Sequence, residues 1–364
     1  MVYGRRGGGL RMAPGARLEL RHRDPTVTYA VDCRMLFMGD RIRLVPRAYQ
    51  EILHWFSSGA AGYRLFEKLA GSAEIQQFYE VGCRDGNVSV TLRDSIFREP
   101  GPIGDLDLVV EVSDGRRSFT APLPVARLKA LGSLLPALCG SHDAEAISAR
   151  VRAGLTPPEA DWALDLFHSL ASNGFITDDP RRAEVFRSPP ARSRVMLLAH
   201  SSLLVQSPKG ALLVDPVLRL DQGLRAEAFD VVRLRLDAIL CSHGHWDHCD
   251  LQTLSWFDKD TPILVPRNRR PTVFNPPIAP ALARLGFTDV REVDHWQPIR
   301  VGDFEVVPVP FHGEQDEPGE EIDHYTYVIR TEGLCLYGGV DGYRDTFGTM
   351  APVLERVRRL YRPD

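Results

Sequence analysis

A short stretch in the second half of the chain concentrates the residue types that bind metal ions. Residues 237–250 read D-A-I-L-C-S-H-G-H-W-D-H-C-D, an apolar run followed at once by three histidines and two aspartates. On an extended backbone, residues two apart point to the same side, so His243 and His245 can reach one metal ion together. Asp247 and His248 follow one turn later and can reach a second ion. Imidazole and carboxylate groups suit zinc, iron and manganese, so this spacing predicts a metal site rather than a solvated polar loop.

Length and composition describe an ordinary globular protein of about two domains. The chain has 364 residues, 44% of them hydrophobic and 25% charged. A formal net charge of −4 argues against general nucleic-acid binding. No apolar run approaches the roughly 20 residues that span a bilayer. The six cysteines form no C-x-x-C pair and no secretory signal is evident, which predicts a cytoplasmic protein with buried free thiols.

The predicted fold class is α/β, with five segments along the chain. Residues 1–17 are glycine-rich and are predicted to be a disordered lead-in. Residues 18–122 are predicted to be a mixed α/β region, and residues 123–179 a helical unit. Residues 180–193, rich in proline and charge, are predicted to be a linker before a second domain at 194–364.

The helical unit at 123–179 has clear local signals. Leucines recur at helical spacing from Leu128, Asp143 precedes a second helix, and Thr156 with Glu159 predicts a capping box for a third. Three helices followed by a short strand resemble a winged helix. Its basic residues are few and interleaved with acidic ones, so we expect no DNA binding. We expect this region to dock a protein partner or to form a dimer.

Short apolar and β-branched runs between turn residues predict the strands of the second domain. These strands are expected at 195–199, 202–206, 211–214, 238–240, 263–265, 290–293, 304–310, 325–331 and 334–338. Helices are expected at 251–257, 280–285 and 351–361. Strands that alternate with short helices indicate a sheet covered by helices.

This second domain resembles the metallo-β-lactamase superfamily. The match is the H-x-H-x-D-H motif from His243 to His248, reinforced by His200 in H-S-S-L-L-V, Asp215 in L-L-V-D-P and Asp341 in Y-G-G-V-D. The resemblance implies an αββα sandwich with two metal ions at the mouth between its sheets. The segments around His200 and Asp215 are similar to the branch that contains ascorbate-6-phosphate lactonase and N-acylphosphatidylethanolamine phospholipase D.

The resemblance also implies roles for single residues. His243 and His245 would hold the first metal ion, Asp247 and His248 the second, and Asp341 would bridge the two. A shared carboxylate offsets the repulsion between two cations. Asp247 would also act as the catalytic residue that orients a metal-activated water.

The third ligand of the first ion has two candidates. The strand V-V-P-V-P-F leads into His312, and Glu314 follows two residues later on the same side of an extended chain. Hydrolytic members of the superfamily have a histidine here. The diiron β-hydroxylase of chloramphenicol biosynthesis, a relative with the same fold, has a glutamate, which is a harder and more iron-friendly ligand. The register of the strand favours His312, and Glu314 is the alternative.

The sequence departs from the family in one respect. No histidine follows Asp341, where family members carry the last ligand of the second ion. The resemblance therefore predicts an incomplete, C-terminally truncated sandwich.

Three functions stay open at this point. The first is a dinuclear hydrolase, with two divalent ions (zinc foremost, iron as the alternative) activating water against an ester, lactone, amide or phosphoester. Its substrate would be a small molecule or a carrier-bound group. The second is a diiron oxygenase that hydroxylates a carrier-bound substrate. The third is an inactive truncated homologue that acts as a binding module.

Overall fold

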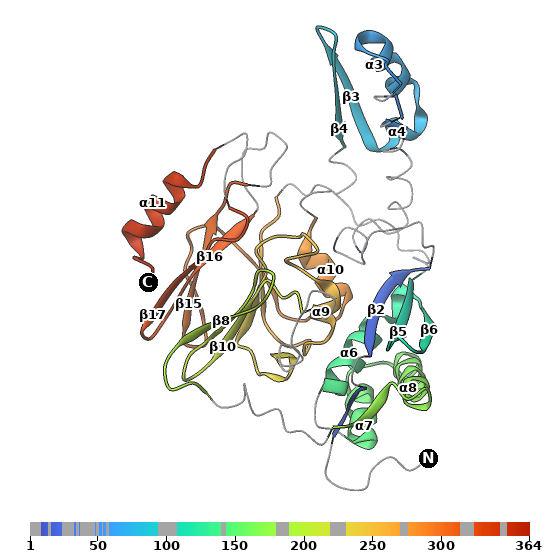
Figure 1. Ribbon diagram of the computed structural model, residues 1–364, viewed down its shortest axis with the longest axis vertical. Helices are drawn as coiled ribbons and strands as arrows, with labels where there is room; N and C mark the ends of the chain where they lie inside the picture. Colours follow the sequence, from blue (N-terminus) through green and yellow to red (C-terminus); the bar gives the residue numbers. More distant parts are fainter. Residues whose placement is uncertain are drawn as a thin grey trace.

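The structure of the protein is a computed structural model. This structure describes residues 9–13, 16–23, 33, 36, 48, 51–52, 54–55, 58–93, 108–139, 143–179, 189–218, 231–269, 276–313, 324–342 and 348–364. The C-terminal half is a two-sheet sandwich, and the N-terminal half consists of smaller units placed along one side of it (Figure 1). Among the described residues, no helix is both long enough and apolar enough to cross a bilayer.

The larger sheet of the sandwich has six strands in the order β13-β12-β11-β10-β9-β8. From β10 to β13 neighbouring strands are parallel, whereas β8, β9 and β10 pair antiparallel. Every residue of β10, β11 and β12 is buried, as expected for parallel strands covered on both faces. The strands are β8 Arg194–Ala199, β9 Ser202–Gln206, β10 Ala211–Val214, β11 Ala238–Leu240, β12 Ile263–Pro266 and β13 Val290–Val293.

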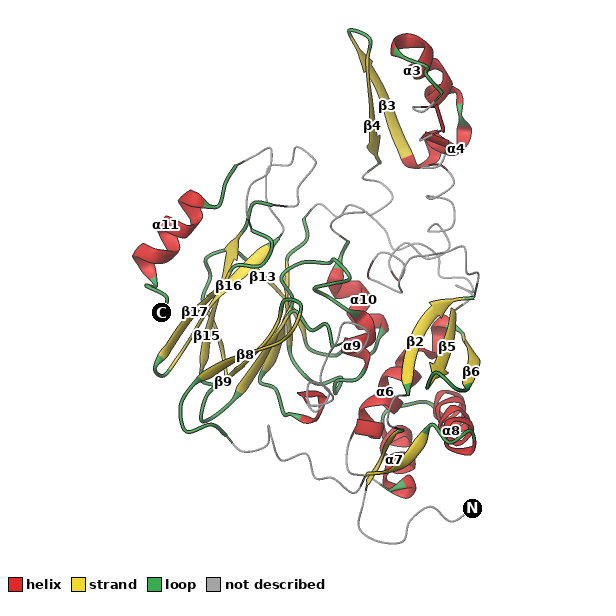
Figure 2. Ribbon diagram, in the orientation of Figure 1, coloured by secondary structure: helices red, strands yellow, loops and turns green. Residues whose placement is uncertain are grey.

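The second sheet is antiparallel, with the order β14-β15-β16-β17. Its strands are β14 Ile299–Val301, β15 Phe304–Pro310, β16 Tyr325–Thr331 and β17 Leu334–Gly338. Alternate side chains of the two sheets meet in a buried core that includes Val205, Leu212, Leu240, Phe304, Val306 and Tyr327. Helix α11 (Ala351–Leu360) covers the outer face of this sheet, and α9 (Leu251–Ser255) and α10 (Ile278–Arg284) cover the larger sheet (Figure 2). This is the αββα order that the motif implied.

The N-terminal half contains three further units. A sheet of β2 (Arg17–His22), β5 (Leu108–Ser113) and β6 (Ser118–Leu123) precedes the 3-10 turn η2 (Val125–Arg127) and the helices α6 (Leu128–Cys139), α7 (Ala144–Ala153) and α8 (Pro157–Ser172). A separate unit of α3 (Gly62–Gly71), α4 (Ala73–Phe78), β3 (Tyr79–Arg84) and β4 (Asn87–Leu92) has its own small core and stands away from the sandwich in Figure 1.

The capping signals at 123–179 are confirmed. Asp143 accepts a hydrogen bond from the backbone N–H of Ala146, and Thr156 and Glu159 form the predicted capping box. Such caps satisfy backbone groups that a helix end leaves without partners.

Two features of the N-terminal half differ from expectation. Part of the lead-in at 1–17 forms strand β1 (Gly9–Met12), because its backbone pairs with β7 (Ile176–Asp179) and Leu10 is buried. Strand β1 precedes the helices in the chain, so its pairing with β7 does not reproduce the hairpin wing of a winged helix. The resemblance to a winged helix is not confirmed. Residues 180–188 of the expected linker lie outside the described residues.

The two halves share one hydrophobic core. Buried leucines of α6, such as Leu131 and Leu135, belong to the same cluster as Leu254 and Leu282 of the sandwich. The approach is close, because a Cβ on Gly132 of α6 would lie 2.5 Å from the carbonyl oxygen of Leu285. The helical unit is therefore packed against the sandwich and not merely tethered to it.

Candidate metal centre

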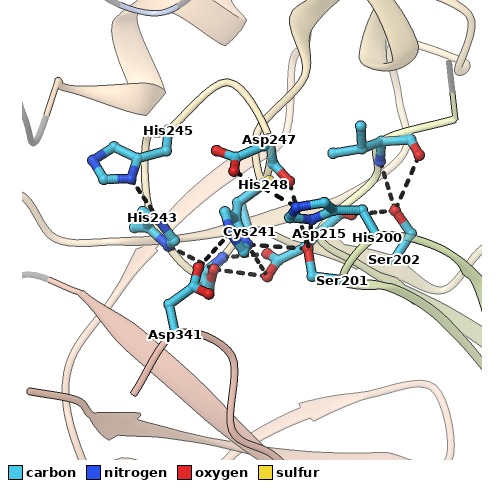
Figure 3. Close-up of polar contacts among 12 residues, drawn as sticks. His200, Ser201, Ser202, Asp215, Cys241, His243, His245, Asp247, His248 and Asp341 are labelled. Carbon is cyan, nitrogen blue, oxygen red and sulfur yellow. Dashed lines mark hydrogen bonds and ion pairs between the residues drawn. The ribbon is translucent and has the colours of Figure 1, made fainter. Parts of the chain in front are cut away.

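The side chains singled out by the sequence lie at one end of the sandwich, in loops that leave the ends of strands (Figure 3). Asp215 directly follows β10, residues 241–250 follow β11, and Asp341 comes shortly after β17. Strands β10 and β11 are parallel neighbours, so their carboxyl ends share one edge of the sheet. Such an edge is where polar side chains from separate loops can converge.

The loop that carries the motif is held in a tight turn. The backbone N–H groups of His248 and Cys249 both donate to the carbonyl oxygen of His245, at 3.1 and 2.7 Å. A side chain is not tolerated at Gly244, because an added Cβ would lie 2.6 Å from the carbonyl oxygen of Pro276. The backbone therefore fixes the directions in which the ligand side chains project.

The first group of candidate ligands comprises His243, His248 and Asp341, whose ligand atoms lie within 4.8 Å of one another. His248 Nε2 is 2.5 Å from Asp341 Oδ2. His245 lies outside this group, but its Nδ1 is 3.0 Å from His243 Nε2. Two nitrogens bound at right angles to one ion would be about 3 Å apart, so this pair has the spacing of shared ligands.

Asp215 orients two of the candidate ligands, His243 through Ser242 and His248 directly. Ser242 Oγ donates to Asp215 Oδ2 at 2.7 Å, so it can accept from His243 Nδ1 at 2.9 Å. His248 Nδ1 lies 3.0 Å from the same carboxylate, which is fully buried. These contacts occupy the Nδ1 atoms and leave Nε2 of each histidine to bind a metal ion.

The two carboxylates also set the protonation of His248. Burial lowers the pKa of this imidazole, but hydrogen bonds and charge interactions with Asp215 and Asp341 outweigh burial and raise the pKa to about 10. Without a metal ion, His248 is therefore a cation between two carboxylates at neutral pH. A metal ion at Nε2 would take the place of that proton.

The backbone at the site is strained at three residues that are not glycine. His200, Asp215 and Asp341 have φ angles of 46°, 44° and 44°, in the left-handed region. Such conformations destabilise a fold by on the order of 1–3 kcal/mol each and tend to occur at functional sites. Here the three residues come from three different loops that meet at the same place.

A second group of candidate ligands comprises His200, Asp247 and His248, again within 4.8 Å of one another. Asp247 and His248 were predicted to share an ion. His200 was noted only as part of a family-like segment, and its contribution depends on how the turn between β8 and β9 folds. Spacing along the chain gives no signal for it.

Of the two candidates for the third ligand, the structure describes only His312. His312 lies in neither group, and a Cβ on Gly348 would lie 2.7 Å from its ring atom Cε1. Its backbone N–H donates to Met350 Sδ at 3.1 Å. Glu314 lies outside the described residues. The imidazole of His312 therefore packs toward the segment before α11.

One further histidine beside the centre was missed. His324 is buried, and its ring centroid lies 5.0 Å from that of His243 and 5.8 Å from that of His245. It directly precedes β16, where a lone histidine has no spacing pattern that could identify it.

The Cys249 side chain in the motif loop packs against another buried cysteine. Cys249 Sγ lies 3.9 Å from Cys33 Sγ, and both thiols are fully buried. The hydrogen bond with Cys241, together with burial, raises the pKa of Cys249 well above its ordinary value. A thiol that stays protonated is a poor metal ligand, so packing is its role.

The donor set fits a metal centre of the kind that the motif implied. Imidazole nitrogens face one another and a carboxylate, and a buried second carboxylate holds the histidines from behind. Imidazole with carboxylate is a combination that binds zinc or iron. Asp341 belongs to the first group, and His248 is the residue common to both groups.

Comparison with known proteins agrees with this geometry. Residues 211–350 match the family model of a beta-lactamase superfamily domain. The 4-amino-L-phenylalanyl-(CmlP-peptidyl-carrier-protein) 3-hydroxylase of Streptomyces venezuelae is 30% identical over 184 residues, which cover 47% of this chain. The matched segment spans only 34% of that protein. The crystal structure of CmlA, a diiron beta-hydroxylase from Streptomyces venezuelae, has a TM-score of 0.56 at 17% identity, with 97% of this chain and 78% of that chain covered.

The fold, the motif and the family match define a class. The chain is a metallo-β-lactamase-fold protein, and the resemblance predicted from its motif is confirmed. Proteins similar to it include hydroxylases, so the comparisons support the superfamily and do not support hydrolysis in particular.

Proposed function

We propose that this protein is a dinuclear iron oxygenase that hydroxylates an amino acid held on a peptidyl-carrier protein. The observation that carries the proposal is the 30% identity over 184 residues to a hydroxylase whose substrate is an aminoacyl group on a carrier protein. The likeness in fold to a diiron beta-hydroxylase from the same organism extends over both halves of the chain, at 17% identity.

The residues of the centre divide between two ions in this proposal. His243 and His245 would hold the first ion, Asp247 and His248 would hold the second, and Asp341 would be shared between them. When bound, the iron pair activates O₂, so that one oxygen atom enters a C–H bond of the substrate and the other leaves as water, with two electrons and two protons from a reductant. Ser242 and Asp215 hold the Nδ1 atoms of His243 and His248, so Nε2 of each ring is the nitrogen that would bind an ion.

We further propose that Glu314, and not His312, is the third ligand of the first ion. Support comes from His312, whose ring lies against the position of Gly348 and in neither ligand group. A carboxylate at this vertex adds negative charge and a hard oxygen donor, which stabilises iron in its oxidised states.

Metal analysis of paired variants tests this assignment. Glu314→Gln should lower the iron content of protein purified from iron-supplemented cells, whereas His312→Ala should leave it near wild type. The reverse outcome would show that His312, and not Glu314, is the third ligand of the first ion. A wild-type protein that carries zinc in place of iron would contradict the oxygenase itself.

Hydrolysis is the second candidate function. It is favoured by the donor set, because centres rich in imidazole suit zinc and two ions can activate a bridging water. In that case Asp247 would orient the water. Zinc-loaded protein that cleaves ester or lactone substrates, together with a lack of O₂ consumption, would support it.

The N-terminal half supplies a surface for the carrier protein in this proposal. A substrate tethered to a carrier must enter the centre while the carrier itself stays outside, so the enzyme needs a docking face near the site. The helical unit α6–α8 is packed on the sandwich through a shared core, so it can hold such a face in a fixed position. Removal of the carrier from the substrate should therefore weaken turnover.

A further inference from the structure

The motif supplies Asp247 and His248 to the second metal ion, with Asp341 shared. We propose that His200, from the turn between β8 and β9, is a ligand of the second ion. This inference rests on the dinuclear centre of the proposed function.

The first support is distance. The ligand atoms of His200, Asp247 and His248 lie within 4.8 Å of one another. Two atoms bound to one ion at about 2.1 Å can be at most about 4.2 Å apart, so the three need to approach by less than about 1 Å. Between His200 Nε2 and Asp247 Oδ2 the distance is 3.7 Å, already within that limit.

The contact between His200 and Asp247 is an ion pair without a hydrogen bond, because at 3.7 Å it is longer than a hydrogen bond between nitrogen and oxygen, which ends near 3.2 Å. Both side chains are also partly exposed, at 40% and 29%, so an ion could enter between them from solvent. In the view of Figure 3, His200 lies on the opposite side of His248 from His243 and Asp341.

The second support is the way the turn is fixed. His200 has a φ of 46°, a conformation that favours glycine or asparagine in a short hairpin turn. The next residue, Ser201, anchors the turn on the motif loop: its hydroxyl lies 3.1 Å from His248 Nδ1 and 3.5 Å from the carbonyl oxygen of Asp247. The strained residue is therefore held beside the two motif ligands by its own neighbour.

Cobalt titration of metal-free protein tests the proposal. Wild-type protein should bind about two Co²⁺ ions per chain, and His200→Asn about one, with loss of part of the visible Co²⁺ absorption. Asparagine tolerates the backbone conformation of residue 200, so the variant should fold. His168→Asn, which changes an exposed histidine of α8, is the matched control and should bind like wild type.

A rescue experiment separates a ligand from a merely structural residue. Glycine also tolerates the φ at position 200, and His200→Gly leaves a space for free imidazole. Added imidazole should restore the second Co²⁺ ion and its absorption in His200→Gly, with no effect on wild type. The inference is overturned if His200→Asn binds two ions with wild-type affinity and spectrum, or if imidazole restores nothing. Wild-type protein that binds fewer than two ions would instead overturn the dinuclear centre on which the inference rests.

Discussion

The two halves of this molecule differ in where their polar side chains lie. In the sandwich, buried polar residues such as Asp215, Ser242 and His248 cluster at one end of the sheets. In the described part of the N-terminal half, the large core is apolar, and neither candidate ligand group draws a residue from it. The difference places both candidate ligand groups in the sandwich, whereas the N-terminal half contributes to the shared core. Substitutions in the sandwich site should therefore affect metal binding. Substitutions in the N-terminal half should affect the stability of the fold.

The largest effect is expected from the first ion. His243→Ala should reduce metal affinity at that site by more than about 100-fold, the upper range for loss of an outer-shell partner alone. Elemental analysis after dialysis gives the measurement. The exposed His168 in α8 provides the control, and His168→Ala should keep its metal. Full metal content in His243→Ala would contradict the assignment of the motif histidines as metal ligands.

A smaller loss is expected from the carboxylate behind the histidines. Asp215→Asn keeps the shape and tolerates the φ of 44°, but it removes the charge that holds His248 Nδ1. Metal affinity should fall by about 10- to 100-fold. Asp85, with a φ of 53° in the turn between β3 and β4, allows a matched control in the other half. Equal affinity in Asp215→Asn and Asp85→Asn would contradict the role of Asp215.

The pH dependence of metal binding should follow His248. Its pKa of about 10 means that a proton occupies the ring at neutral pH and must leave when metal binds. Metal affinity should therefore rise with pH, by about tenfold per unit for each proton displaced. Calorimetric titrations in buffers of different ionisation enthalpy measure the released protons. Binding without proton release at pH 7 would show that His248 is neutral or not a ligand.

The smallest effect is expected from the contact between the halves, and it should appear in stability. Gly132→Ala places a Cβ 2.5 Å from a backbone oxygen of the sandwich, which no change of rotamer relieves. We expect a loss of about 1–3 kcal/mol in the free energy of unfolding, with metal content unchanged. At Gly154 an added Cβ meets nothing within 4 Å, so Gly154→Ala is the control. A normal melting temperature for Gly132→Ala would argue against the shared core.

The same contrast explains what the sequence could predict. Strands β9, β13, β15, β16 and β17 begin and end at the predicted residues, because short apolar or β-branched runs bounded by turn residues define them locally. The ligands of the motif are adjacent in sequence, so their spacing alone brings them together. His200 and His324 come from distant segments, and only the tertiary fold places them beside His243 and His248. Strand β1 was missed for the same reason, since its partner β7 lies far along the chain.

The most direct test of the proposed function follows the fate of O₂. Iron-loaded protein, a reductant and an aminoacyl group on its carrier protein are incubated under isotopically labelled O₂, and the carrier is weighed by mass spectrometry. The account predicts that the aminoacyl group gains one labelled oxygen atom, and that the gain is lost in His243→Ala. Release of the aminoacyl group from the carrier, with oxygen derived from water, would contradict the oxygenase and establish hydrolysis.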